Sequence, residues 1–141
     1  MAVQLSQTLK NMFNPKVIKE ALKRTWIWNG NPETLSYNLT NGEDKEISLL
    51  IHDVFGGEIL KTPQKKGWHF YNRINGERLD FSNSELGKFI KGTQLKDIPV
   101  TQEEANQYFD QADYSTFYMQ FIRAFEEILG LKKHRTRYST R

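Results

Sequence analysis

Residues 67–81, GWHFYNRINGERLDF, form the stretch that most limits what this chain can fold into. Asn75-Gly76 is the dipeptide that best supplies the two positive φ angles of a type I′ turn, and alternating residues flank it on both sides. A two-residue loop fixes the register, so the stretch predicts a β-hairpin. The predicted cross-strand pairs are Ile74 with Glu77, Arg73 with Arg78, Asn72 with Leu79, Tyr71 with Asp80, and Phe70 with Phe81.

The side chains of this hairpin divide between two faces, because successive residues of a strand point to opposite sides. One face is predicted to carry Trp68, Phe70, Ile74, Leu79 and Phe81, and the other His69, Tyr71, Arg73, Arg78 and Asp80. His69 is diagonal to Asp80, roughly 7–8 Å away between backbones, which a side-chain hydrogen bond can span. This is the geometry in which a carboxylate orients an imidazole. His69 and Asp80 are therefore the first candidate site residues.

A helix that begins near Gly42 supplies a third candidate. Apolar residues recur at helical spacing, and Gly56-Gly57 is a typical left-handed end to a helix. Little polar surface follows Ser48, so this is predicted to be the buried central helix. Asp44 lies in its first turn, where the helix dipole favours an anion. The apolar positions are Ile47, Leu50, Ile51, Val54 and Phe55.

The other elements complete an α+β pattern with three antiparallel strands. Asn14-Pro15 starts a helix, and Thr101 with Glu104 forms a capping box that opens a helix to about Phe109. Asp97-Ile98-Pro99 is interpreted as a break. The remaining predicted elements are a strand at residues 58–62, helices at 82–90 and 113–129, and a long connection at 29–41 that could line a cleft.

The length of 141 residues predicts one domain over residues 1–131 and a basic tail at 132–141. The tail holds five of the 20 basic residues and no acid, which leaves 15 basic against 17 acidic residues in the body. A slightly acidic body disfavours nucleic acid as a partner, except through the tail. No apolar run approaches the ~20 residues of a membrane span, so no membrane association and a cytoplasmic location are expected. The absence of cysteine excludes disulfides and a thiol nucleophile.

The order of elements, a buried central helix followed by strands that bear His and then Asp, resembles small papain-like or NlpC/P60-like domains. The segments HDVFGGEIL, GWHFYN and NGERLDF resemble the bacterial YunG family, over roughly residues 20–125 in order. In that family a Gly-Gln-Cys-like helix start precedes the GGEIL segment. The resemblance places Gly42-Glu43-Asp44 where Gly-Gln-Cys is expected, so Asp44 stands in the place of the cysteine.

Three functions follow as hypotheses. The first is a non-catalytic, degenerate cysteine-hydrolase-like domain, or pseudoenzyme, that binds an unidentified protein or peptide and uses no metal or cofactor. Its degenerate site would be Asp44, His69 and Asp80, with Trp68, Tyr71 and Asn72 as binding candidates. The second is a hydrolase that uses Asp44, His69 and Asp80, with a metal or by acid–base chemistry. The third is a nucleic-acid accessory protein that acts through the tail.

Overall fold

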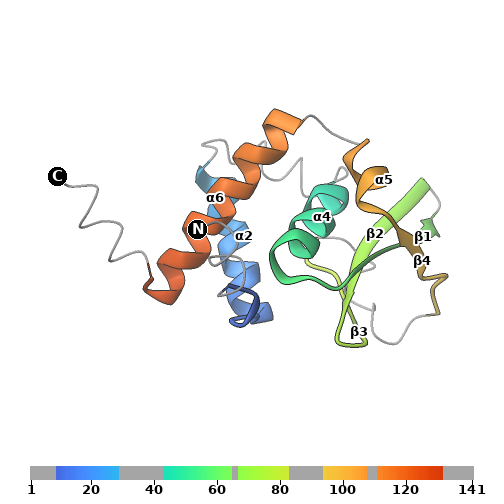
Figure 1. The fold of residues 1–141 in the computed structure, drawn as a ribbon, viewed down its shortest axis with the longest axis horizontal. Coiled ribbons are helices and arrows are strands. Elements are labelled where there is room, and N and C mark those ends of the chain that lie inside the picture. Colours follow the sequence, from blue (N-terminus) through green and yellow to red (C-terminus); the bar gives the residue numbers. More distant parts are fainter. Residues whose placement is uncertain (1–8, 29–42, 65–66, 83–93, 108–110, 132–141) are drawn as a thin grey trace.

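The computed structural model describes residues 9–28, 43–64, 67–82, 94–107 and 111–131 (Figure 1). The α+β class predicted from the sequence is confirmed. The connection at 29–41, residues 83–90 of the predicted short helix, and the tail at 132–141 lie outside the described residues. The helices are α2 (Pro15–Trp28), α4 (Glu43–Phe55), α5 (Gln102–Asn106) and α6 (Gln111–Leu129), and the strands are β1 (Glu58–Gln64), β2 (Gly67–Ile74), β3 (Glu77–Leu79) and β4 (Ile98–Val100).

The predicted hairpin is present as β2 and β3. Ile74 pairs with Glu77, Arg73 with Arg78, and Asn72 with Leu79, as the two-residue turn requires. The turn residues have positive φ angles, 53° at Asn75 and 80° at Gly76. The sheet is antiparallel with the order β3-β2-β1-β4, so β2 and β1 are its central strands.

The prediction of three strands is wrong, because the segment interpreted as a break forms β4. Ile59 of β1 pairs with Val100, and Lys61 pairs with Ile98. Pro99 made the segment look like a break, since proline cannot donate to a ladder. β4 lies at the edge of the sheet, where proline is tolerated. β1 is also longer than predicted and extends to Gln64.

The β2–β3 ladder ends earlier than predicted, at Leu79, so Asp80 and Phe81 do not continue the strand. Asp80 Oδ1 accepts hydrogen bonds from the Ser82 amide at 2.9 Å and the Ser82 hydroxyl at 2.5 Å. This local turn bends the chain out of the ladder. In an antiparallel strand, the amides of alternate residues point to the same side. The Phe70 amide therefore points to the edge of β2 at which β3 would have continued. That amide donates to the Asp44 carboxylate instead.

Helix α4 lies between the sheet and the helix pair α2 and α6, as Figure 1 shows. The consecutive residues Leu49, Leu50 and Ile51 are each 0% exposed, so more than one side of the helix is covered. At its carboxyl end, Phe55 packs edge-on against Phe121 and Phe125 of α6. The prediction of a buried central helix is confirmed.

The helix ends follow the predicted chemistry, with one difference in length. Asn14 Oδ1 accepts from the Lys16 amide at 3.0 Å, and Thr101 Oγ1 accepts from the Glu104 amide at 3.1 Å. Helix α5 ends at Asn106 and not near Phe109, because the Gln107 amide donates to the Glu104 carbonyl in a tighter closing turn. After α4, Gly57 has φ 81°, and a Cβ there would lie 2.6 Å from the Arg73 carbonyl oxygen.

Candidate functional site

The structure brings Asp44, His69 and Asp80 together, and we call these residues the His69 cluster. Asp44 comes from the first turn of α4, His69 from β2, and Asp80 from the residue after β3. His69 Nε2 lies 2.5 Å from Asp80 Oδ2, and Nδ1 lies 3.5 Å from Asp44 Oδ2. Each ring nitrogen therefore faces a carboxylate, and the two carboxylates approach from opposite sides of the imidazole.

The His69 cluster is nearly closed to solvent. The side chains of His69, Asp44 and Asp80 are 9%, 11% and 1% exposed. Burial lowers the pKa of His69. The hydrogen bond to Asp80 and the charges of Asp80 and Asp44 together raise it by more than burial lowers it, so the pKa lies above its ordinary value. Nε2 lies within hydrogen-bond distance of Asp80 Oδ2, while Nδ1 forms a longer ion-pair contact with Asp44 when the imidazole is protonated.

Both carboxylates of the His69 cluster are also anchored to the backbone. Asp44 Oδ2 accepts from the Phe70 amide at 2.7 Å, while Asp80 Oδ1 accepts from the Ser82 amide. Asp44 thus ties the start of α4 to the open side of β2. This contact depends on the early end of the β2–β3 ladder, and the sequence pattern gave no signal for it.

The contacts of the two ring nitrogens bear on what the cluster can do chemically. A general base needs a ring nitrogen that can reach a substrate proton, and both nitrogens of His69 face carboxylates of the chain. A cation on either nitrogen would meet only one of the two carboxylates, because they lie on opposite sides of the ring. Within the described ranges, no group of three His, Asp or Glu residues could hold a metal ion.

The three binding candidates differ in exposure. Trp68 is 46% exposed, and Lys61 Nζ lies 4.5 Å from its ring centroid. Tyr71 and Asn72 are each 1% exposed, so the chain itself uses their polar groups. The Asn72 amide donates to the Ser48 carbonyl at 2.9 Å, and the Tyr71 hydroxyl donates to Asp97 at 2.7 Å. Of the three, Trp68 alone offers a large exposed surface.

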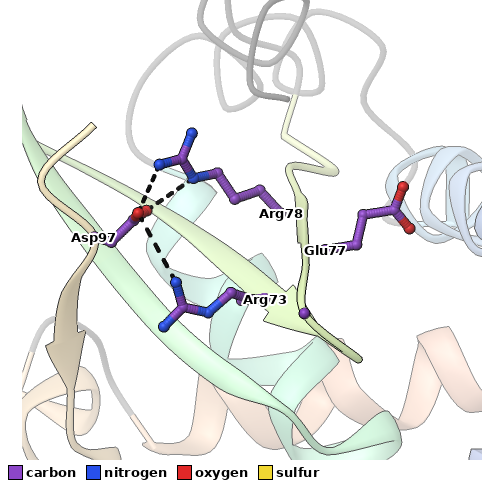
Figure 2. A pocket seen from close by; sticks show the side chains of 5 residues that line it. Arg73, Glu77, Arg78 and Asp97 are labelled. Carbon is purple, nitrogen blue, oxygen red and sulfur yellow. Dashed lines mark hydrogen bonds and ion pairs between the residues drawn. The ribbon is translucent and has the colours of Figure 1, made fainter. Parts of the chain in front are cut away.

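A second group of charged residues lies on the same face of β2, and we call Arg73, Arg78 and Asp97 the Arg73 cluster. Arg78 Nε and Nη2 donate to Asp97 Oδ1 and Oδ2 at 3.0 and 2.6 Å. Arg73 Nη1 lies 3.8 Å from Asp97 Oδ2. Figure 2 shows both guanidinium groups directed at this one carboxylate. The predicted register placed Arg73 opposite Arg78, but Asp97 could not be foreseen because its segment was interpreted as a break.

Tyr71 connects the two clusters. Its ring stacks on the His69 imidazole, with centroids 6.2 Å apart and an interplanar angle of 16°. Its hydroxyl donates to Asp97, and burial together with this hydrogen bond raises the pKa of Tyr71. The hydrogen bond from Arg78 holds the pKa of Asp97 below its usual value. On one face of β2, ring stacking and hydrogen bonds through Tyr71 therefore connect the His69 cluster with the Arg73 cluster.

Comparison with known proteins assigns the chain to a family. The model of the YunG protein family matches residues 14–126, a range that contains both clusters. The chain belongs to the YunG family. It is 31% identical over 111 residues to "Uncharacterized protein YunG" of Bacillus subtilis (strain 168), an alignment that covers 79% of this chain and 94% of that YunG relative. No solved structure gives a significant match, and no helix in the described ranges is long and apolar enough to span a membrane.

Proposed function

We propose that this YunG-family chain is a degenerate cysteine-hydrolase-like domain that has no hydrolytic activity and binds a protein or peptide. The observation that carries the proposal is the pair of carboxylates on the two nitrogens of His69. With a carboxylate of the chain facing each nitrogen, the imidazole has no open position from which to activate a nucleophile or a water molecule.

The comparison with papain-like sites supports the proposal. Such a site needs a thiolate beside one imidazole nitrogen and an orienting group at the other nitrogen. Here Asp44 lies at the amino end of a buried helix beside Nδ1, and Asp80 lies at Nε2. Asp44 has the place of the thiol but is a poor nucleophile, because the helix dipole and the imidazolium both stabilise its charge.

The binding half of the proposal rests on Trp68. Aromatic side chains that are partly exposed and held rigidly are common anchors in protein interfaces. Trp68 lies next to His69 on β2, and the Lys61 ammonium covers part of its ring. Glu104 holds that ammonium in turn, with Lys61 Nζ 2.5 Å from Glu104 Oε2. This tryptophan is thus a preorganised contact surface one residue from His69, on the opposite face of β2.

A thiol placed at position 44 tests the cysteine-hydrolase-like geometry. The natural chain has no cysteine, so Asp44→Cys carries a single thiol. Beside His69 and the helix amino end, its pKa should fall below about 7.5, as measured by the ultraviolet absorbance of the thiolate across pH. Glu46→Cys is the matched control, since it lies in the same helical turn without a contact to His69. Equal pKa values for the two thiols would contradict the proposed geometry.

The absence of activity is tested on the unmodified protein. The wild type should not cleave a fluorogenic casein substrate or simple anilide and ester substrates above the rate of a heat-denatured sample. Hydrolysis by the wild type that Asp44→Asn abolishes would overturn the proposal and support a hydrolase that uses Asp44, His69 and Asp80.

The binding role is tested with a random peptide library displayed on phage. Peptides selected on the wild type should lose binding to Trp68→Ala and keep binding to Met119→Ala. Met119 is the matched control because it is 59% exposed and lies on α6. Peptides that bind the Trp68 variant as well as the wild type would refute a Trp68 surface.

A further inference from the structure

The Arg73 cluster contains an arrangement that is costly without compensation. Arg73 and Arg78 are directly opposite each other on β2 and β3. Like charges at directly opposed positions of an antiparallel pair destabilise a sheet. Asp97 offsets the repulsion, because its carboxylate lies between the two guanidinium groups. The two positive charges explain why a carboxylate lies between Arg73 and Arg78. They also indicate that a carboxylate is the chemical group that fits at this position.

Asp97 is held in an unusual backbone conformation to reach this place. Its φ angle is 51°, in the left-handed region that residues other than glycine rarely adopt. The Tyr71 hydroxyl donates to Asp97 Oδ1, and the Asp97 amide donates back to the Tyr71 oxygen at 3.2 Å. The position of the carboxylate is therefore fixed from several sides.

Among the described residues, one edge of the Arg73 guanidinium has no hydrogen-bond acceptor. Nε and Nη2 donate to the Glu58 carboxylate at 2.7 and 3.2 Å. The remaining nitrogen, Nη1, approaches Asp97 Oδ2 only to 3.8 Å, too long for a hydrogen bond. In the part of the chain that the structure describes, Nη1 makes no hydrogen bond.

This edge of Arg73 borders an open hollow. The hollow has a volume of about 570 Å³ and is lined by Arg73, Gly76, Glu77, Arg78 and Asp97. That volume lies within the range of small-molecule sites. Figure 2 shows the Glu77 side chain directed away from the guanidinium pair. Among the lining residues that the structure describes, the charged groups that face the hollow are the two guanidinium groups and the Asp97 carboxylate.

We propose that this hollow binds a carboxylate group of a ligand, through Arg73 Nη1 and the positive charge of Arg78. A planar guanidinium matches a carboxylate in shape and hydrogen-bond geometry. Asp97 shows that a carboxylate fits between these arginines, because its two oxygens already accept hydrogen bonds from Arg78. The ligand carboxylate occupies the neighbouring position that Asp97 leaves unfilled. The site is separate from the His69 cluster and does not depend on the function proposed above.

The binding is tested by nuclear magnetic resonance of the arginine Nε–Hε groups, at constant ionic strength. Three probes are titrated: acetyl-alanine with a main-chain carboxylate, acetyl-glutamate methylamide with a side-chain carboxylate, and the neutral acetyl-glutamine methylamide. At least one carboxylate should shift the Arg73 signal and the Gly76 amide saturably, and the neutral probe should not. The carboxylate that binds more tightly identifies the source, either a chain terminus or an acidic side chain.

Two substitutions with opposite expected effects separate a ligand site from a structural ion network. Arg73→Gln should weaken carboxylate binding about tenfold, since it removes the donor edge. Asp97→Asn should tighten binding several-fold, because it removes the competing charge; asparagine also tolerates the left-handed backbone. Arg24→Gln is the control, as Arg24 is an exposed α2 residue paired with Glu20. Amide spectra of each variant verify the fold.

Shifts that rise linearly with probe concentration, or that survive Arg73→Gln, would overturn the proposal. So would weaker carboxylate binding in folded Asp97→Asn, which would mean that the ligand needs the Asp97 charge. Saturable binding of inorganic phosphate, with no response to either carboxylate, would overturn the assigned ligand class.

Discussion

Two clusters on one face of β2 have opposite charge patterns. In the His69 cluster one imidazole lies between two carboxylates, and the side chains are 1–11% exposed. In the Arg73 cluster one carboxylate lies between two guanidinium groups, and the side chains are 20–31% exposed. In the buried cluster a carboxylate faces each ring nitrogen, whereas Nη1 of Arg73 in the exposed cluster has no hydrogen-bond acceptor among the described residues. The difference teaches that burial, more than the charge pattern, decides which cluster can serve a ligand.

The same substitution in the two clusters should give the largest contrast. Asp80→Asn removes one charge from a buried pair and should lower the free energy of unfolding by about 3 kcal/mol near pH 6. Asp97→Asn removes one charge from a partly exposed network and should cost about 1 kcal/mol or less. Urea unfolding of both variants measures the difference. Equal losses would show that the two clusters are not distinguished by burial.

The hairpin turn should matter to both clusters, since one register places His69 and Arg73. Gly76→Val should lower the free energy of unfolding by about 1–2 kcal/mol, because valine does not easily adopt a positive φ. No atom lies within 4 Å of a Cβ at Gly76, so the cost is that of the backbone alone. Glu77→Val is the control, as an exposed strand position accepts valine. An unchanged melting temperature for Gly76→Val would contradict the conclusion that the type I′ turn stabilises the fold.

The two clusters should lose stability at opposite ends of the pH scale. The pKa of His69 is raised, so its contribution is complete below the ordinary value of 6.5 and is lost as the pH rises through the folded-state pKa. The pKa of Asp97 is lowered, so its contribution is present above the ordinary value of 3.8 and is lost as the pH falls through the folded-state pKa.

Unfolding free energies measured across the pH range, for the wild type and each Asn variant, check this prediction. Asp80→Asn should flatten the loss on the alkaline side, and Asp97→Asn should flatten the loss on the acidic side. If both variants changed the same side of the profile, the contrast between the clusters would fail.

Salt should produce the smallest effect, and only in the Arg73 cluster. Raising the salt concentration from about 0.02 M to about 0.5 M should remove most of the cost of Asp97→Asn, because partly exposed pairs are screened. The cost of Asp80→Asn should change little, since buried pairs are screened much less. A salt-dependent Asp80→Asn would indicate that water reaches the His69 cluster.

Local chemistry made much of the fold predictable from the sequence. Asn75-Gly76 determined the register that places His69 near Asp80, and Gly56-Gly57 determined the end of the central helix. Asp97 and β4 could not be predicted, because pairing with β1 overrides the local signal of Pro99. The burial of Tyr71 and Asn72 depends on partners distant in sequence, Asp97 and the Ser48 carbonyl. Hairpin alternation alone does not show which side chains a neighbouring segment will cover.

The protonation state of His69 tests the central claim most directly. Nitrogen shifts of the imidazole, followed across pH, report the midpoint and whether each ring nitrogen carries a proton. With a carboxylate at each nitrogen, the midpoint should lie above 6.5, both nitrogens should be protonated below it, and Asp44→Asn should lower it. Asp53→Asn is the control, because Asp53 lies on the same helix and accepts from Tyr114 and Gln102. A midpoint at or below 6.5, or one that Asp44→Asn leaves unchanged, would contradict the account.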